Sequence, residues 1–303
     1  MIMDSSHVEE AMQVLTSALF QLKWRLKHSS KLRLETDILA LCSGMRPLVM
    51  IDYGGKMPQL QDQLCSLLAH ISKESTIFQQ LRVMVIEDMI YLLNAKEFSE
   101  YIIWSLSSDA NQCFVDLEQD PLEMVSAALG SSCIKELESV QKFFSSVFTP
   151  DGVNRDALQG KNDDQQNAKA SSRICQYSKV LDCSSCMQDY QISIPTLNGW
   201  LLGYPVVYLF GKDHISDAIY NLSTTPLHLY HVLVHRNVSS STTSSPEELM
   251  SFSVPYELSM KGRNESWARA FWVEVQAKHE KCKQVWRSIH MEVDECYPQA
   301  IAL

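Results

Sequence analysis

The chain has 303 residues, 46% of them hydrophobic and 20% charged, with a formal net charge of −10 at pH 7. This composition excludes a coiled coil, a collagen-like chain and a generally disordered protein, and the acidic balance argues against a nucleic-acid partner. No stretch approaches about 18 uncharged apolar residues, so the sequence predicts no membrane-spanning helix.

The first half of the chain alternates helical and strand patterns. Apolar residues at steps of three and four predict helices over 7–28, 34–44, 58–72, 97–106 and 121–147. Short apolar runs predict strands at 48–52, 81–87 and 113–117, and leave 89–93 open to either type. This alternation is typical of a parallel or mixed sheet with helices on its faces.

The second half has a more β-rich pattern. Residues 149–173 are polar and small, which predicts a disordered insertion, and the serine- and threonine-rich run 239–245 predicts a flexible loop. Strands are expected at 192–194, 200–202, 206–210, 227–234 and 252–258, with a hairpin turn at Asn198-Gly199. A long apolar stripe predicts a closing helix over 264–291.

We therefore expect an α/β or α+β fold. A mixed sheet with flanking helices would have a parallel-type first half, and the second half would carry antiparallel strands and a long C-terminal helix. Residues 1–303 are expected to form one globular unit, in which the polar insertion separates a half at 1–148 from a half at 174–303.

The cysteines bear on the compartment. There are nine, an odd number at irregular spacing, and residues 1–10 lack a basic segment followed by an apolar core. Because this pattern fits neither a disulfide scaffold nor a signal peptide, we expect reduced thiols in a cytoplasmic or nuclear protein.

Some stretches of sequence point to a family. They are Leu-Val-Met-Ile-Asp-Tyr-Gly-Gly at 48–55 with Pro-Gln-Leu at 58–60, Leu-Gly-Tyr-Pro-Val-Val-Tyr at 202–208, and the tryptophan-rich C-terminal helix. In these stretches the chain resembles the uncharacterised vertebrate family named after open reading frame 74 of human chromosome 1. The resemblance covers most of the chain except the polar insertion, and it implies no activity, cofactor or catalytic residue.

Acidic residues follow three of the predicted strands. Asp52, Glu87 and Asp116 each close an apolar run, with Asp88 and Glu118 beside the last two. In a parallel sheet such strand ends meet at one edge, where open α/β folds bind ligands. Carboxylates there could hold Mg²⁺ or orient a ribose hydroxyl.

The turn after the first strand adds a weak signal for cofactor binding. Asp52, Gly54 and Gly55 precede a helix, as in the first loop of S-adenosylmethionine-dependent methyltransferases. However, there is no G-x-G pattern, and Glu87 lies 33 residues beyond Gly54 rather than about 20. The alternative is that the glycines form a tight turn and the acids are solvated strand ends or helix caps.

Two further groups have metal-ligand residue types. Cys183 and Cys186 have zinc or redox spacing, but no second pair of ligands lies nearby in the sequence, so loop cysteines are the alternative. In a strand, His231 and His235 would share a face and His228 the other, and hydrogen bonding at a sheet edge is the more common role for such histidines.

A basic run near the N-terminus is the last candidate. It consists of Lys23, Arg25, Lys27, His28, Lys31 and Arg33. It could touch a nucleic acid or an anionic membrane, but cations are also expected around a helix end.

The sequence thus predicts a soluble intracellular protein that acts by binding another protein and has no evident active site. The alternative is a diverged nucleotide- or S-adenosylmethionine-binding enzyme that uses Asp52, Gly54, Gly55, Glu87 and Asp116. No metal ligand set is assigned, and the sequence leaves open whether there is catalysis, which cofactor would serve it, and the oligomeric state.

Overall fold

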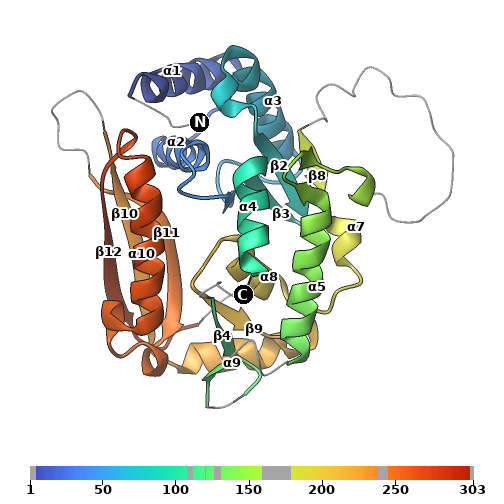
Figure 1. Ribbon diagram of the computed structural model, residues 1–303, viewed down its shortest axis with the longest axis vertical. Coiled ribbons are helices and arrows are strands. Elements are labelled where there is room, and N and C mark those ends of the chain that lie inside the picture. The colour runs from blue at the N-terminus through green and yellow to red at the C-terminus, as the bar shows by residue number, and fades with distance from the viewer. Residues whose placement is uncertain are drawn as a thin grey trace, which may run out of the picture. The chain divides into compact units, whose positions relative to one another are not determined.

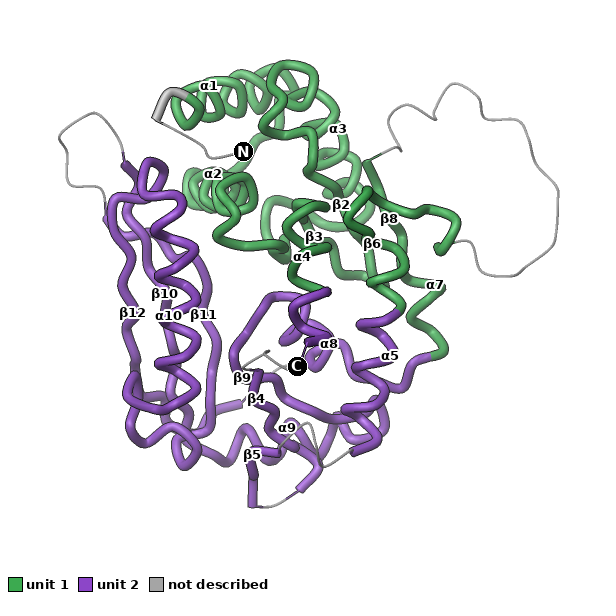
Figure 2. The backbone as a smooth tube through the Cα atoms, viewed as in Figure 1, with its two compact units in different colours: residues 1–102, 143–189 green, residues 103–142, 190–303 purple. Residues whose placement is uncertain are grey.

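The computed structural model describes residues 5–107, 112–119, 121–125, 131–158, 179–237 and 245–300, and it belongs to the α+β class (Figure 1). The chain divides into two compact units, each made of two separate segments (Figure 2). Unit 1 comprises residues 1–102 and 143–189, and unit 2 comprises residues 103–142 and 190–303. Two of the three boundaries, after residues 102 and 142, fall inside helices, and the third, after residue 189, does not.

Unit 1 is built around a four-stranded mixed sheet. The strands are β1 (Leu48–Met50), β2 (Leu81–Ile86), β3 (Met89–Asn94) and β8 (Val180–Asp182), in the order β1-β3-β2-β8. β3 is antiparallel to both of its neighbours, whereas β2 and β8 are parallel. The helices are α1 (Ser5–Gln21), α2 (His28–Cys42), α3 (Gln59–Glu74), α4 (Ala95–Ser105), the C-terminal end of α5 (Ser132–Val147) and α7 (Ser184–Met187).

Short elements complete unit 1. They are the 3-10 turns η1 (Thr76–Phe78) and η3 (Asp156–Leu158) and the paired strands β6 (Phe148–Thr149) and β7 (Gly152–Val153). Residues 149–158, which the sequence assigns to the polar insertion, therefore carry defined elements, and 159–173 lie outside the described residues. Phe98, Phe144 and Phe148 pack in the core, with the rings of Phe98 and Phe148 4.9 Å apart between centroids.

In its described residues, unit 2 contains two three-stranded sheets. The first has the order β5-β4-β9, with β4 (Cys113–Asp116) parallel to β9 (Val206–Leu209) and antiparallel to β5 (Glu123–Val125). The second is antiparallel, in the order β11-β10-β12, and consists of β10 (Leu227–Arg236), β11 (Glu247–Pro255) and β12 (Trp286–Cys296). The helical elements are most of α5, α8 (Ile194–Leu201), η4 (Lys212–His214), α9 (Ile215–Thr224), η5 (Tyr256–Leu258), η6 (Gly262–Asn264) and α10 (Ser266–Lys281).

An aromatic core joins α10 to the antiparallel sheet. Figure 1 shows this helix running along one face of the sheet, with β12 as an outer strand. The ring of Tyr230 stacks on Phe252 at 5.1 Å and meets Trp267 edge-on at 5.2 Å between centroids. Phe271 also contacts Phe252, at 5.6 Å. Buried aromatic side chains of this kind supply most of the apolar contact area between a helix and a sheet.

Several predicted elements are wrong in type or length. Asn198 and Gly199 lie inside α8 instead of a hairpin, and the strand predicted at 200–202 is replaced by the end of α8 and its C-cap, Leu202. The C-terminal helix ends at Lys281, and the chain then forms β12, because this segment pairs along the whole of β10. Where the sequence predicts one helix over 121–147, Glu123–Val125 forms β5 and α5 begins at Ser132.

Candidate functional site

The turn after β1 is packed against the segment that follows α1. Gly54 has a φ of +85°, and a Cβ atom there would lie 2.9 Å from Leu26 Cδ2 and 3.3 Å from Trp24 Cζ2. The indole N–H of Trp24 donates a hydrogen bond to the carbonyl of Gly54 at 3.2 Å. The glycine therefore permits a left-handed turn beneath two apolar side chains, which fill the space beside it.

Tyr53, in the same turn, reaches a buried carboxylate. Its hydroxyl donates to Asp37 Oδ2 at 2.6 Å, and Arg33 Nε lies 3.4 Å from the same oxygen. Asp37 is only 2% exposed, and burial raises the pKa of its carboxyl while Arg33 acts in the opposite direction. Burial also raises the pKa of Tyr53, so the phenol remains a hydrogen-bond donor. These contacts give the turn a structural role.

Asp52 and Glu87 lie at one edge of the unit 1 sheet. β1 and β2 run in the same direction with β3 between them, so their carboxyl ends share an edge, and both side chains are exposed. Glu87 has a φ of +52° and stands in the tight turn between β2 and β3. Its N–H donates to Ser184 Oγ at 2.9 Å, which ties this turn to α7.

Asp116 stands in another sheet, at the end of β4 in unit 2. The structure therefore does not gather Asp52, Glu87 and Asp116 at a single sheet edge. The reason is that β4 pairs with β5 and β9 in a separate sheet. Ligand binding by Asp52, Gly54, Gly55, Glu87 and Asp116 remains a prediction.

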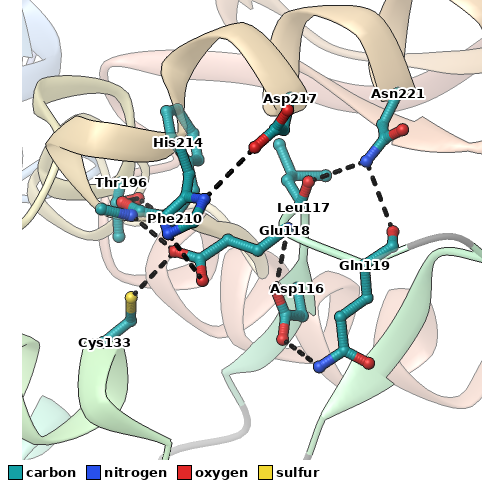
Figure 3. Close-up of polar contacts among 11 residues, drawn as sticks. Asp116, Leu117, Glu118, Gln119, Cys133, Thr196, Phe210, His214, Asp217 and Asn221 are labelled. Atoms are coloured by element: carbon teal, nitrogen blue, oxygen red, sulfur yellow. Dashed lines mark hydrogen bonds and ion pairs between the residues drawn. The ribbon is translucent and has the colours of Figure 1, made fainter.

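The carboxyl edge of β4 and β9 carries a compact polar cluster (Figure 3). Glu118 Oε1 accepts hydrogen bonds from the Gly211 N–H at 2.8 Å and from the Cys133 thiol at 3.5 Å. The second oxygen, Oε2, lies 3.8 Å from His214 Nε2, and His214 Nδ1 lies 3.2 Å from Asp217 Oδ2. The cluster thus links the ends of two parallel strands to the beginnings of α5 and α9.

The protonation states follow from these contacts. Burial, followed by the charge of Glu118, raises the pKa of the Cys133 thiol to about 11. The hydrogen bond to Asp217, followed by the charge of Glu118, raises the pKa of His214. A thiol that is protonated at neutral pH is a poor nucleophile.

A pocket of about 180 Å³ opens beside this cluster. Its lining residues are Glu118, Ser132, Cys133, Glu136, Gln191, Ile192, Gly211, Lys212, Asp213 and His214. The carboxylate of Glu136 accepts the Gln191 N–H at 2.8 Å, so two carboxylates of the lining are each held by a backbone N–H. Cys133 and His214 were missed by sequence reasoning, although the polar run after the predicted strand 206–210 was a usable signal.

The predicted metal-ligand candidates, the histidines of β10 and the cysteines at 183 and 186, have hydrogen-bond partners or are buried. His228 hydrogen-bonds to Ser259 at 3.0 Å and His231 to Glu248 at 2.9 Å. Cys183 is fully buried, and Cys186 donates to a backbone carbonyl at 3.6 Å. In the part of the chain that the structure describes, no three histidine, cysteine or acidic residues are arranged to hold a metal.

Two residues of the predicted basic run form ion pairs within α2. Lys31 lies 3.7 Å from Glu35, and Arg33 lies 3.4 Å from Asp37, both as pairs four residues apart on α2. These two ion pairs support α2, and a binding role for the basic run as a whole stays a prediction.

A larger groove of about 490 Å³ lies between α10 and β12 in unit 2. Its lining residues are Arg263, Asn264, Arg269, Trp272, Val273, Ile289, His290 and Met291. Val273 is 64% exposed although it is apolar, and β12 pairs with only one strand, β10, among the described residues. The groove therefore combines an exposed apolar surface with the unpaired side of a strand.

The chain belongs to the family described as a domain of unknown function (DUF4504), which matches residues 16–303. Neither the curated proteins nor the solved structures contain a significant match to the chain. Among the described residues, no helix is long and apolar enough to cross a membrane.

Proposed function

We propose that this protein binds another protein by adding an extended segment of the partner to the outer side of β12. One observation carries the proposal: β12 is 11 residues long and forms the edge of its sheet. A long unpaired edge exposes backbone N–H and C=O groups, and peptide-binding domains use such edges to take up a partner as an additional strand.

The groove beside this edge supplies side-chain contacts for the added strand. Ile289, Met291 and Val293 alternate along β12 opposite Val234, Val232 and Tyr230 of β10. Tyr230 packs against α10, so this is the side of β12 that faces the helix. Because alternate residues of an added strand point the same way, every second partner residue would enter the groove.

Selection of peptides by the full chain tests the proposal. We expect a display library to yield extended peptides that bind the wild-type protein and lose at least about tenfold in affinity to Val273→Glu, which places a charge in the groove. Ala277→Glu is the matched control, because Ala277 is exposed on the same helix and does not line the groove.

Comparison of the two variants shows whether the selected peptides bind in the groove or elsewhere on the protein. Equal affinity of the selected peptides for wild type, Val273→Glu and Ala277→Glu would contradict strand addition at β12. Failure to select any peptide with the folded wild-type chain would contradict it as well.

The pocket beside Glu118 supports a second candidate, a small-molecule site in an enzyme related to nucleotide- or S-adenosylmethionine-binding proteins. Its supporting observation is the pair of oriented carboxylates, Glu118 and Glu136, which suit an ammonium group. A thermal-shift screen with nucleotides and S-adenosylmethionine, repeated with Glu118→Gln and Asp52→Asn, tests it. A shift lost only in Glu118→Gln would locate the ligand here, and a shift lost only in Asp52→Asn would locate it at the unit 1 edge.

We also propose a cytoplasmic or nuclear location and the narrower family named after open reading frame 74 of human chromosome 1. Every cysteine among the described residues is a free thiol, which suits a reducing compartment. Fractionation of cells that express the tagged chain tests the location, and recovery in a secretory compartment would contradict it.

A further inference from the structure

We infer that the groove between α10 and β12 selects an extended acidic segment whose carboxylates point toward α10. The inference rests on the proposed strand addition at β12 and adds the chemistry of the partner. It is carried by two arginines, Arg263 in η6 and Arg269 in α10, that line this groove.

Both arginines are exposed and contact only neutral oxygen atoms in the described structure. Arg269 donates from Nε and Nη2 to the Asn264 carbonyl, at 3.0 and 2.7 Å. Arg263 donates from Nη1 to the Met291 carbonyl at 3.2 Å. Among the described residues, neither guanidinium forms an ion pair with a carboxylate. The groove thus presents two uncompensated positive charges, although the chain as a whole carries −10.

The apolar residues of the groove favour a peptide over a simple anion as the ligand. Trp272, Val273 and Ile289 line the same groove as the arginines. A free phosphate would not contact these apolar side chains. A peptide whose groove-facing residues, every second one along its strand, include both acidic and apolar side chains would contact the arginines and the apolar residues. Guanidinium groups also bind carboxylates through two parallel hydrogen bonds, which adds directional preference.

Arg263 has a further consequence for access to the edge. Its side chain reaches a β12 carbonyl, so it covers part of the strand in the absence of a partner. A partner carboxylate would draw the guanidinium away from Met291, and that carbonyl could then accept an N–H of the added strand. Exchange of one acceptor for another keeps the arginine hydrogen-bonded throughout.

The other side of β12 restricts where the partner's acids can stand. Glu292 and Asp294 alternate with Met291 and Val293 along β12, and Asp294 lies 3.7 Å from His231, so these acids stand on the side of β12 away from α10. Like charges at neighbouring positions of adjacent strands are destabilising. The partner is therefore expected to carry acids at alternate positions only, with neutral or basic residues between them.

Titration with synthetic peptides tests the inference on the full chain. In the probe peptide every second residue is threonine, and the residues between the threonines are glutamate or valine. The comparison peptide has lysine in place of each glutamate. We expect the glutamate peptide to bind more tightly than the lysine peptide by at least about tenfold at low salt. Arg269→Glu should abolish that preference, because it leaves Arg263 opposite a new carboxylate, whereas Lys281→Gln, at an exposed residue of α10 outside the groove, should not change it.

The possible outcomes distinguish failure of the acidic preference from failure of strand addition at β12. If both peptides bind equally and Val273→Glu abolishes both, strand addition stands and the acidic preference is wrong. If neither peptide binds the folded protein, both are wrong. If the protein instead associates with itself through β12, seen as concentration-dependent mass that Val273→Glu removes, a second copy is the occupant and the acidic partner is contradicted.

Discussion

At the scale of single residues, Tyr53 connects the turn after β1 to a buried carboxyl group. Its hydroxyl contacts the nearly buried carboxyl of Asp37 at 2.6 Å. We expect Tyr53→Phe to lower the free energy of unfolding by about 1–3 kcal/mol, the usual cost when a buried polar group loses its hydrogen-bond partner. Chemical denaturation measures this change.

Asp52→Asn is the matched control for that measurement. Asp52 adjoins Tyr53 but is exposed, and surface substitutions of this kind change stability by about 0.5 kcal/mol or less. Equal losses in the two variants would show that the contact between Tyr53 and Asp37 does not hold the turn.

His214 provides a prediction about pH at the same scale. Its pKa is raised in the folded state by Asp217 and then by Glu118, from an ordinary value of 6.5. Protonated His214 therefore stabilises the fold below about pH 6.5, and this contribution is lost as the pH rises through the folded-state pKa. We expect the melting temperature of wild type to exceed that of His214→Gln at low pH and to converge with it at high pH.

Asp217→Asn checks the assigned cause. It removes the carboxylate that is 3.2 Å from His214 Nδ1, so the pH dependence of the difference should become weaker in that background. A difference between wild type and His214→Gln that stays constant across the pH range would contradict the assignment.

At the scale of elements, α8 shows how a local signal was overridden. The pair Asn198-Gly199 favours a hairpin, yet Ser193 caps a helix here and Pro195 occupies its first turn. Gly199 also allows a close approach, because a Cβ atom would stand 3.2 Å from Val207 Cγ1 of β9. The cap and the proline were visible in the sequence, whereas the approach of β9 was not.

The cap of α8 can be tested directly. Ser193 is fully buried, and its Oγ accepts from the Thr196 N–H at 3.3 Å and lies 2.9 Å from Thr196 Oγ1. We expect Ser193→Ala to cost about 1–2 kcal/mol in the free energy of unfolding. Thr224→Ala, at the exposed end of α9, should cost clearly less, and equal costs would contradict the capping role.

Other elements show which sequence patterns are informative. The alternation at 227–234 predicted a strand with His231 and His235 on one face, and the burial pattern of β10 confirms this. The apolar spacing through Trp286 predicted a helix as far as residue 291. This was wrong, because spacing within the segment carries no information on the ten residue pairs that β12 forms with β10.

At the scale of the whole molecule, long-range connections limited what could be foreseen. The α+β class was predictable because helical and strand patterns both recur along the chain. The division into two units was not, since each unit joins segments from distant parts of the sequence. For the same reason Asp116 belongs to a different sheet from Asp52 and Glu87, while Cys133 and His214 meet beside Glu118.

Residue-resolved amide hydrogen exchange tests the central claim of strand addition most directly. It would be recorded on the full chain with and without the alternating glutamate peptide. We predict slowed exchange at alternate residues of Trp286–Cys296, because every second N–H of an edge strand points toward the added strand. Unchanged exchange along β12 under saturating peptide, or protection confined to the segments around Glu118 and His214, would contradict the account.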